Sequence, residues 1–477
     1  MQTKNSISLN RMEEIGQRLN FIYKGDPRIE TYRRDAVMTG NPDAVAKPRD
    51  RQELDEILEW CYGNNVPVTV CGGRTSMTGA SVAEGGVLIT TDHFNKIIDV
   101  GTKNGRPYGV VEPGVIIGEF QKTVEGLGYY YPVAPTSCFD AFIGGTVATN
   151  ATGEDFYRYG PTRNFVREIS YLKIDGSTGT SARQTNPKIS KGYGGYYLDG
   201  DEIDRLIGSE GTLSVTTRVV VDLLAGVPET FIILAPFASN MDALKFIAEI
   251  NREEKRPRSL EFIDSYALSL MKTHKACPKF SEGIRALVYI KDETPTPPSP
   301  IKGEGDMEYW AERIKSEEAI VAVTEKQKAE IKALRHHIPA TISETHERLE
   351  RSGGGKVGAD WWVPRDKMLK MMEEVYAESM PLRAIFTAFA HLGDGHPHAD
   401  YLCRTPEEMK LASKLVIAQC RRAVSYGGGV AGEHGIGKIK RHLLPIQHSQ
   451  ETIAKMRRVK EEFDPKWLLG RGNIFIR

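Results

Sequence analysis

The sequence predicts an α+β protein made of two domains. Its 477 residues suit two to four domains at roughly 100–200 residues each. Helical and strand-like patterns are interspersed: Leu54, Ile57, Leu58 and Cys61 recur at helical spacing, and a short apolar strand at 66–70 follows at once. The 46 glycines gather in short loops between such segments. Mixed elements joined by glycine-rich loops indicate the α+β class.

The first domain is expected to cover residues 42–225, after a helical N-terminal segment at 1–41. Helical spacing and strand-like alternation follow one another through this region. The expected helices are 50–65 and 117–126, and the expected strands are 66–70, 86–91, 108–112, 168–174 and 212–223.

The second domain is expected to cover residues 226–477. The proline-rich stretch 292–305 is predicted to be an exposed loop inside it, since proline lacks the N–H that a sheet ladder needs. The last fifty residues are predicted to be helical and to end in a loop at 470–473. The other expected helices are 241–254, 260–272, 309–351 and 406–425, and the expected strands are 286–291, 384–391 and 396–402.

The composition excludes several classes of protein. Lys and Arg number 63, as do Asp and Glu, so a zero net charge offers no broad electrostatic surface for nucleic acid or anionic lipid. No apolar run approaches the roughly 18–20 residues of a membrane span, and the first ten residues lack a signal-peptide core. The six cysteines have neither CxxC nor ferredoxin spacing. We expect a cytoplasmic protein with reduced thiols and without nucleic-acid partners.

Two glycine-rich stretches imitate nucleotide-binding motifs. Residues 353–358 fit GxGxxG, but a charged helix precedes them and Trp361 follows, which is not the strand–loop–helix context of a dinucleotide fold. Residues 432–438 nearly fit a P-loop, but Ile439 stands where Ser or Thr should bind Mg²⁺. We expect neither stretch to bind a nucleotide.

Three loops rich in Gly, Ser and Thr fall within the first predicted domain, at 71–79, 135–160 and 208–216. Glycines let consecutive backbone N–H groups converge on an anion, and the hydroxyls of Thr75 and Ser76 add donors. A single loop of this kind is more often an ordinary turn. Three together suit a cofactor that has a pyrophosphate and a polar ring system.

Three of the 11 histidines lie within eight residues, at 391, 396 and 398. If 392–397 is a hairpin turn, His391 and His398 face each other with Cβ atoms about 4.5–5.5 Å apart, which lets both bind one metal. Glu433 would add a carboxylate ligand. The alternative is a solvated histidine-rich hairpin, but the Glu433–His434 pair between two glycines favours a metal site.

His434 and Arg335 are candidates for the chemistry itself. An imidazole has a pKa near neutral pH, so His434 suits a general base, although it would also serve to cap a local turn. The guanidinium of Arg335 is the usual clamp for a substrate carboxylate, but an arginine on a helix is more often solvated.

Taken together, these motifs resemble a known family. The three loops, with 191–198 and 208–213, are similar to the FAD-binding domain of the vanillyl-alcohol oxidase (PCMH) superfamily. The motif His391-x-Gly-Asp-Gly-x-x-His398, the triplet 433–435 and the tail 463–473 match the C-terminal FAD-linked oxidase domain. The resemblance covers about 42–477. It is strongest for the group of the glycolate oxidase FAD subunit, D-lactate dehydrogenase and D-2-hydroxyglutarate dehydrogenase.

The resemblance implies a PCMH-type FAD-binding domain at 42–225. It also implies a C-terminal cap or substrate domain at 226–477, with an antiparallel sheet and helices, whose last fifty residues return to the flavin. The residues expected to surround FAD are Cys71, Gly72, Gly73, Arg74, Thr75, Ser76, Thr78, Gly79, Pro135, Thr136, Ser137, Gly144, Gly145, Asn150, Gly153, Gly160, Glu210, Gly211, Val215 and Asn473.

The same resemblance implies a metal-dependent site. His391, His398 and Glu433 match the ligands of a divalent metal (Zn, Mn or Fe), His434 matches the general base, and Arg335 matches the arginine that binds the substrate carboxylate.

The chain departs from the family pattern at several positions. Cys71 and Arg74 stand where the family often has Arg and Gly or Asn. His396 replaces a frequent Asn, so it is expected to be a third metal ligand or a catalytic contact to the substrate. His93 is the one histidine of residues 1–225, and it lies outside the loops that carry histidyl-FAD. We therefore expect FAD to be bound non-covalently.

The sequence thus predicts an FAD-dependent dehydrogenase that oxidises a D-2-hydroxy acid to the 2-oxo acid. Trp361 and Trp362 replace smaller residues, which either admits a larger or more apolar acid or serves packing. Without an NAD fingerprint or an iron–sulfur motif, electrons are expected to leave to an electron-transfer flavoprotein, an iron–sulfur subunit or a quinone. Such a partner would place the protein at a membrane periphery. The oligomeric state is open, with a homodimer among the options.

Three alternatives remain open. The first is an oxidase of the same family that reduces O₂. The second is a flavin-free zinc hydrolase built on the His/Glu cluster, which leaves the glycine-rich loops unexplained. The third is a non-catalytic binding protein that uses the 292–305 loop as a ligand segment.

Overall fold

The chain forms two compact units. The computed structural model describes residues 16, 18, 19, 21–187, 191–294 and 307–477. Unit 1 comprises Met1–Gly153, Gly160–Val227 and Glu433–Arg477, and unit 2 comprises Glu154–Tyr159 and Pro228–Gly432. Of the helical segment expected at 1–41, residues 1–15, 17 and 20 lie outside the described residues, as does most of the loop expected at 292–305. The described part of 1–41 shows that this prediction is wrong in part, because it contains a strand at Ile22–Tyr23 and only a short 3-10 helix at Pro27–Tyr32.

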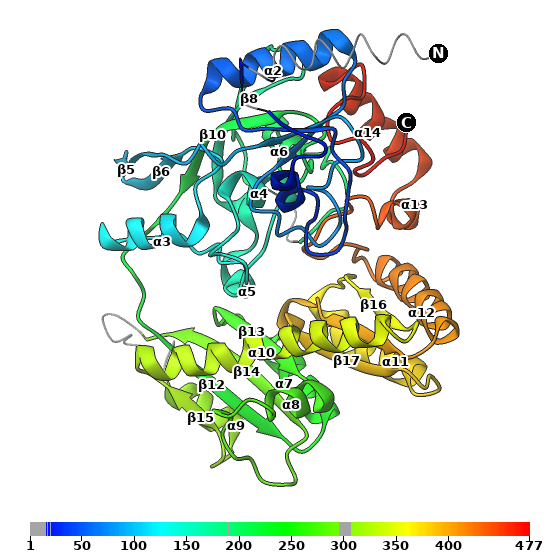
Figure 1. The fold of residues 1–477 in the computed structure, drawn as a ribbon. Helices are drawn as coiled ribbons and strands as arrows, with labels where there is room; N and C mark the ends of the chain where they lie inside the picture. Colours follow the sequence, from blue (N-terminus) through cyan, green and yellow to red (C-terminus); the bar gives the residue numbers. More distant parts are fainter. Residues whose placement is uncertain (1–15, 17, 20, 188–190, 295–306) are drawn as a thin grey trace. The chain divides into compact units, whose positions relative to one another are not determined.

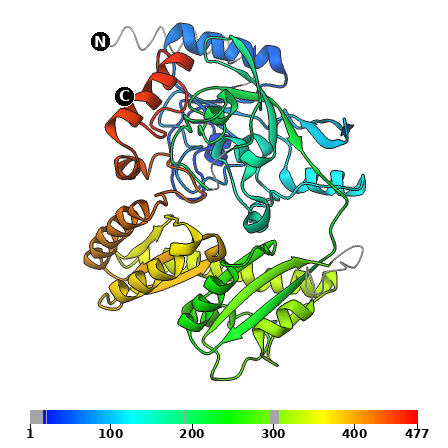
Figure 2. The same ribbon diagram turned by 180° about the vertical axis from the view of Figure 1, so that it is seen from behind.

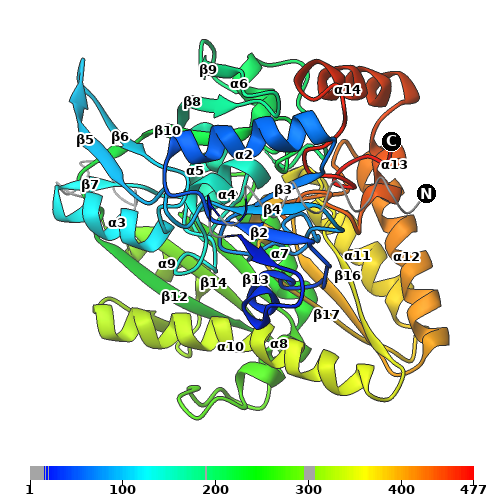
Figure 3. The same ribbon diagram turned by 45° about the horizontal axis from the view of Figure 1, so that its top comes forward.

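Unit 1 contains a four-stranded sheet covered by helix α2 (Arg51–Asn64), as Figure 3 shows. The carboxylate of Asp50 caps the helix by accepting the N–H of Glu53 at 3.0 Å, and Asn65 ends it with a left-handed φ of 58°. The apolar face predicted for this helix is confirmed, because its residues are buried against the strands. In sheet order these are β1 (Ile22–Tyr23), β2 (Ala44–Ala46), β4 (Val87–Thr90) and β3 (Val68–Cys71).

The second sheet of unit 1 has five antiparallel strands. Helix α3 (Ile117–Gly126) packs here, and Gly109 makes room for Phe120, since a Cβ would lie 2.7 Å from its ring. In sheet order the strands are β5 (Ile97–Lys103), β6 (Arg106–Val111), β10 (Val215–Asp222), β8 (Val166–Leu172) and β9 (Thr178–Ala182). Unit 1 also contains β7 (Tyr129–Tyr130), β11 (Leu224–Ala225), α4 (Ile143–Thr149), α6 (Glu202–Leu206), α13 (Leu444–Gln447) and α14 (Gln450–Phe463).

Unit 2 is built on a seven-stranded antiparallel sheet with helices packed against it (Figure 1). In sheet order the strands are β15 (Ile320–Ala322), β12 (Thr230–Phe237), β14 (Ala286–Glu293), β13 (Ser259–Ile263), β17 (Ile385–Ala390), β18 (His398–Cys403) and β16 (Gly355–Ala359). The helices are α5 (Phe156–Tyr159), α7 (Asn240–Ile250), α8 (Ser265–Met271), α9 (Met307–Ile314), α10 (Glu325–Glu350), α11 (Met368–Ser379) and α12 (Pro406–Ser425).

The core of unit 2 lies between this sheet and helix α10. Ile331, Leu334 and Ile338 recur on one face of α10 and are buried with α8 and with side chains of β12 and β14. Figure 2 shows the long green strands β12 and β14 side by side from behind. Among the described residues, no helix combines the length and the apolar character needed to cross a bilayer.

Two predicted helices of unit 2 are wrong in part. Residues 259–263 form strand β13, and α8 begins only at Ser265, where the Asp264 carboxylate accepts the N–H of Ala267 at 2.8 Å. All five residues of β13 are buried, including the polar Ser259 and Glu261, and so short a segment leading into a helix does not reveal by its periodicity that it is a strand. The helix expected at 309–351 is interrupted by the edge strand β15.

Candidate functional site

The first glycine-rich loop follows strand β3 in unit 1, and its backbone packs against the backbone of the second glycine-rich loop. A Cβ on Gly73 would come within 1.8 Å of the Asp140 carbonyl oxygen, so only glycine permits this approach of the first two loops. The Ser76 hydroxyl closes the loop by accepting the N–H groups of Thr78 and Ala80 at 3.2 and 3.3 Å. The loop is therefore held by its own contacts before any ligand is considered.

The two unusual residues of this loop have separate roles. Cys71 is buried at the end of β3, and burial raises the pKa of its thiol to about 12. Arg74 takes a left-handed φ of 57°, and its guanidinium carbon lies 4.9 Å from the centre of the Tyr32 ring. The guanidinium thus has a cation–π partner within unit 1.

The second and third loops meet at helix α4. Asn150 ends this helix in the left-handed conformation, and its side-chain oxygen accepts a backbone N–H. The N–H groups of Gly208 and Glu210 donate to the carbonyls of Val147 and Ala148 at 3.0 and 2.8 Å. These bonds join residues 208–210 to the last turn of α4.

The glycines around α4 differ in how much room a side chain would have at each position. A Cβ on Gly144 would lie 2.5 Å from Pro113, and one on Gly153 would lie 2.4 Å from Ala134. A Cβ on Gly145 would meet nothing within 4 Å. The open surface of α4 beside the polar loops fits a cofactor that passes over Gly145.

Replacing Gly145 with alanine should therefore change two properties in opposite directions. The free energy of unfolding of the apoprotein should be unchanged or higher by about 0.5–1 kcal/mol, because alanine favours a helix. The Kd of FAD should rise about tenfold or more, because the methyl group occupies cofactor space. Flavin titration of the apoprotein measures the Kd. Gly126→Ala, at a helical glycine that also has open space, is the control; an unaltered Kd in Gly145→Ala would contradict this placement of FAD.

The carboxylate of Glu210 accepts hydrogen bonds from another segment of unit 1. It accepts the N–H of Ile436 at 2.7 Å and that of Gly437 at 2.5 Å. The side chain is buried, and burial raises the pKa of Glu210. The two N–H bonds lower this pKa by a smaller amount, so that it lies at about 7. Glu210 thus contacts the segment that carries Glu433 and His434, a contact that the sequence did not indicate.

Asn473 brings the end of the chain to the same loops. Its Nδ2 donates to the carbonyls of Ala80 and Glu210 at 2.8 and 2.9 Å, and its Oδ1 accepts from Nζ of Lys438 at 2.6 Å. Lys438 also donates to the carbonyl of Gly79 at 3.1 Å, and burial lowers the pKa of this amine to about 8. Segments 79–80, 210, 436–438 and 473 therefore converge within unit 1.

Glu433 and His434 are paired side chains of unit 1. The Glu433 Oε1 atom lies 3.1 Å from Nε2 of His434, and Oε2 accepts the hydroxyl of Thr152 at 2.5 Å. The His434 carbonyl accepts the hydroxyl of Thr78 at 3.4 Å. The imidazole keeps about a quarter of its surface exposed, which suits a base that must reach a ligand.

The histidine hairpin of unit 2 differs in register from the prediction. His398 pairs with Phe389, not with His391, because the chain turns at Ala390 with φ of 69° and leaves the ladder. The His391 and His398 rings are nevertheless 5.4 Å apart between centres, with ligand nitrogens within 4.8 Å of each other. Two imidazoles at this separation fit one divalent metal.

His396 lies inside unit 2. It has no exposed surface, and its Nε2 lies 2.9 Å from Oδ1 of Asp360, which is also buried. Gly432 is required beside it, since a Cβ there would lie 2.5 Å from the imidazole. This geometry gives His396 a carboxylate partner, whereas the sequence predicted a metal or substrate contact.

Arg335 of α10 is bound by a carboxylate of its own unit. Its Nε and Nη2 donate to Oε2 and Oε1 of Glu261 at 2.5 and 2.7 Å. The same Oε1 lies 3.2 Å from Nδ1 of His391. Burial raises the pKa of Glu261, but Arg335 and His391 outweigh it and hold that pKa at about 2. Glu261 therefore joins the predicted arginine to a predicted metal ligand.

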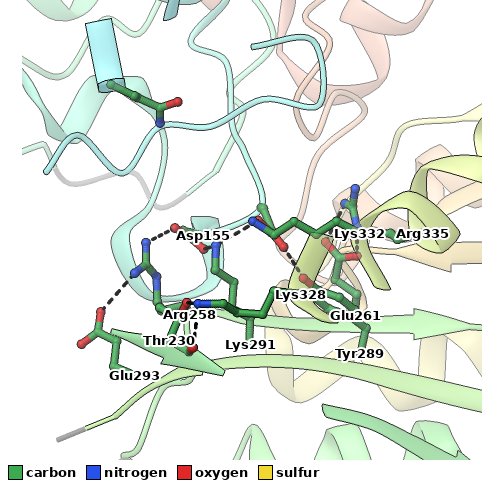
Figure 4. Close-up of polar contacts among 12 residues, drawn as sticks. Asp155, Thr230, Arg258, Glu261, Tyr289, Lys291, Glu293, Lys328, Lys332 and Arg335 are labelled. Atoms are coloured by element: carbon green, nitrogen blue, oxygen red, sulfur yellow. Dashed lines mark hydrogen bonds and ion pairs between the residues drawn. The ribbon is translucent and has the colours of Figure 1, made fainter. Parts of the chain in front are cut away.

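Glu261 and Arg335 belong to a larger buried network, shown in Figure 4. Nζ of Lys291 lies 2.9 Å from Glu154 and 2.8 Å from Asp155, and the short segment of unit 2 that carries these two carboxylates is thereby fixed to β14. Burial raises the pKa of Glu154, but Lys291 and other nearby cations hold it well below its usual value. Sequence reasoning missed this network; the one signal was a lysine closing the apolar run 286–290.

The predicted site residues are thus divided between the units. The residues expected to surround FAD lie in unit 1, as do Glu433 and His434, while Arg335, His391, His396 and His398 lie in unit 2.

Comparisons with known proteins agree with these features. The family model described as FAD linked oxidases, C-terminal domain, matches residues 228–474, and a model described as FAD binding domain matches 42–180. Two solved structures of alkyldihydroxyacetonephosphate synthase share the fold; one has a TM-score of 0.65 at 18% identity, covering 94% of this chain and 81% of its own.

Three curated relatives are similar over nearly their whole length. Glycolate oxidase subunit GlcD of Bacillus subtilis is 28% identical, covering 96% of this chain and 93% of the relative. D-lactate dehydrogenase of Anaerostipes hadrus is 27% identical, covering 98% and 96%. D-2-hydroxyglutarate dehydrogenase of Stutzerimonas stutzeri is 27% identical, covering 91% of each. Since the C-terminal domain model alone spans more than half of the chain, this protein belongs to the family of FAD-linked oxidases and is an FAD-dependent oxidoreductase.

Proposed function

We propose that this oxidoreductase is a dehydrogenase that acts on the CH–OH group of a D-2-hydroxy acid and releases the 2-oxo acid. The observation that carries the proposal is the pair of imidazoles at His391 and His398, supported by the His434–Glu433 pair. Removing a hydride from an alcohol is easier when the hydroxyl proton is acidified and taken by a base. The relatives named above are called after glycolate, D-lactate and D-2-hydroxyglutarate, which are 2-hydroxy acids.

In this proposal His391 and His398 bind a divalent metal together with Glu433. Glu261 accepts from Nδ1 of His391, which fixes the tautomer and leaves Nε2 as the metal-binding nitrogen. Glu433 follows Gly432 directly in the chain, and Gly432 packs against the ring of His396 in the same hairpin. A bound Zn²⁺, Mn²⁺ or Fe²⁺ would supply a Lewis acid for the substrate hydroxyl.

His434 is proposed to take the hydroxyl proton. Its Nε2–H donates to Glu433 in the neutral ring, which leaves Nδ1 as the basic nitrogen. The bond from the Thr78 hydroxyl to its carbonyl fixes the backbone of this residue. His434 can therefore accept a proton without large movement of the main chain.

Arg335 is proposed to bind the substrate carboxylate with one part of its guanidinium. Glu261 accepts the Nε–H and one N–H of Nη2, so the two N–H groups of Nη1 and the second N–H of Nη2 are the donors that the pair with Glu261 does not use. Its charge is maintained, because Glu261 raises the pKa of the guanidinium more than burial lowers it. A substrate carboxylate held by the outer edge of the guanidinium, through Nη1 and the second N–H of Nη2, would be oriented by a fork of two donors. His396 is proposed to support the hairpin through Asp360.

FAD is proposed to be held without a covalent bond by the three loops of unit 1, and when bound it accepts the hydride at N5. We propose that its electrons then pass to an external acceptor: an electron-transfer flavoprotein, an iron–sulfur subunit or a quinone. The relative from Bacillus subtilis is named as a subunit, which supports a protein acceptor.

The proposal is tested by an anaerobic titration of the purified holoprotein with a panel of D- and L-2-hydroxy acids. One or more D-acids should bleach the flavin band near about 450 nm, and the matching L-acids should leave it unchanged, since binding and transition-state contacts distinguish enantiomers. A flavin that no acid bleaches would overturn the substrate class. Stoichiometric peroxide on admission of air would instead identify an O₂-reducing oxidase.

A further inference from the structure

We infer that Glu210 is a positioning residue for His434: its buried carboxylate holds the 433–438 loop in place through two backbone N–H groups. This inference rests on the proposed role of His434 as the base. Glu210 lies in the third glycine-rich loop, where the sequence predicted a contact with FAD. The inference gives its carboxylate a different role, which is to hold the loop that carries His434.

The loop is shaped around this carboxylate. Consecutive N–H groups of Ile436 and Gly437 point at Oε1 and Oε2, so each carboxylate oxygen accepts one bond, at 2.7 and 2.5 Å. Gly435 allows this approach, because a Cβ there would lie 2.6 Å from Oε1 of Glu210, and its φ of 76° is one that glycine adopts without strain. The Gly-Ile-Gly sequence after His434 is therefore explained by a bound carboxylate rather than by a nucleotide phosphate.

Glu210 is itself fixed on the other side. Its N–H donates to the carbonyl of Ala148 at 2.8 Å, its carbonyl accepts from Asn473, and its φ of 54° is left-handed. The tether therefore runs from the end of α4, through Glu210, to the residues just after His434. It is a rigid connection between the predicted FAD loops and the predicted base, all within unit 1.

The carboxylate is specifically suited to this task. Both of its oxygens accept hydrogen bonds, whereas an amide offers one acceptor and would direct an N–H₂ group at a backbone N–H. Glutamine therefore loses one tether bond and gains one donor–donor contact at nearly constant volume. Displacement of a reacting group by about 1 Å costs about 10²-fold in rate.

The test compares Glu210→Gln with the wild-type holoprotein. We expect FAD content and the Kd of the most effective 2-hydroxy acid to stay within about threefold, while the rate of flavin reduction at saturating acid falls about 10–100-fold. Hydrogen exchange at the amides of Ile436 and Gly437 should accelerate. Gly435→Ala should give the same rate loss, because its Cβ displaces the carboxylate from the other side.

Asp464→Asn is the matched control. Asp464 is also a buried carboxylate of unit 1, and it accepts a backbone N–H from Leu469 at 2.7 Å and pairs with Lys460. Its substitution should lower stability without changing the rate of flavin reduction. Wild-type reduction rates in both Glu210→Gln and Gly435→Ala would overturn the inference, as would a loss of FAD large enough to account for the slower rate. If no acid reduces the wild-type flavin, the proposed function fails, while amide exchange in Glu210→Gln still decides the tether.

Discussion

Replacing His434 with alanine should slow the reduction of the bound flavin by about 10²–10⁴-fold, the usual contribution of a positioned general base. The reason is local: the imidazole keeps exposed surface, its Nε2 is bonded to Glu433, and its backbone carbonyl is fixed by Thr78. Alanine leaves the backbone bonds in place and removes the proton acceptor. Anaerobic stopped-flow measurement of flavin reduction at saturating 2-hydroxy acid gives the rate directly.

His93→Ala is the control for this experiment. His93 is an exposed histidine of the same unit, and it lies outside the three loops, so its removal should leave the rate unchanged. Reduction of His434→Ala at close to the wild-type rate would remove His434 from the mechanism while leaving the assignment of the flavoprotein intact.

The parts of the fold that the sequence predicted best are those with local signals. Helix α3 has the predicted bounds, and α12 begins where Thr405 accepts the N–H of Glu408, at a Thr-Pro pair visible in the sequence. The resemblance to FAD-linked oxidases is confirmed by the two family models that match the chain. It could be recognised from the sequence because it depends on motif residues and their order in the chain, which need no three-dimensional information.

The hairpin at 385–403 shows where such signals end. The sequence placed three histidines together, but it could not indicate that Ala390 would turn the chain with a positive φ and shift the pairing from His391 to Phe389. Alanine rarely adopts this conformation, so no propensity predicts it. The two rings still approach each other, because the turn between them is short.

The roles of the carboxylates Glu210 and Glu261 could not be predicted from the sequence for a different reason. Glu210 contacts a loop 226 residues later, and Glu261 contacts an arginine 74 residues later. Nothing in the local pattern of either residue indicates its partner, since Glu261 is a single charged residue in a five-residue strand and residues 208–211 read as a turn. Both residues became interpretable only when the fold placed them beside residues that the motifs had already identified.

Replacing His398 with alanine should abolish tight binding of the divalent metal and slow flavin reduction by roughly 10²–10⁴-fold, since a Lewis acid supplies several kcal/mol of charge stabilisation. His398 begins strand β18, so its backbone is fixed by pairing with Phe389 and alanine should preserve the hairpin. Metal content of the purified protein by mass spectrometry is the primary measurement. This measurement reports loss of the metal. Thermal unfolding of the same variant reports separately whether the fold is preserved.

Chelation provides the complementary test of the same site. Treating the wild-type protein with a chelator should reproduce the rate of His398→Ala, and added Zn²⁺, Mn²⁺ or Fe²⁺ should restore activity to the wild type but not to the variant. His274→Ala, at a histidine of unit 2 outside the hairpin, should behave as the wild type in both treatments. A metal-free wild-type protein whose flavin is reduced at the full rate in the presence of chelator would contradict the metal site. His391, beside Glu261, and His398 would then be packed imidazoles without a metal, and His434 would have to remove the proton from a hydroxyl that no cation acidifies.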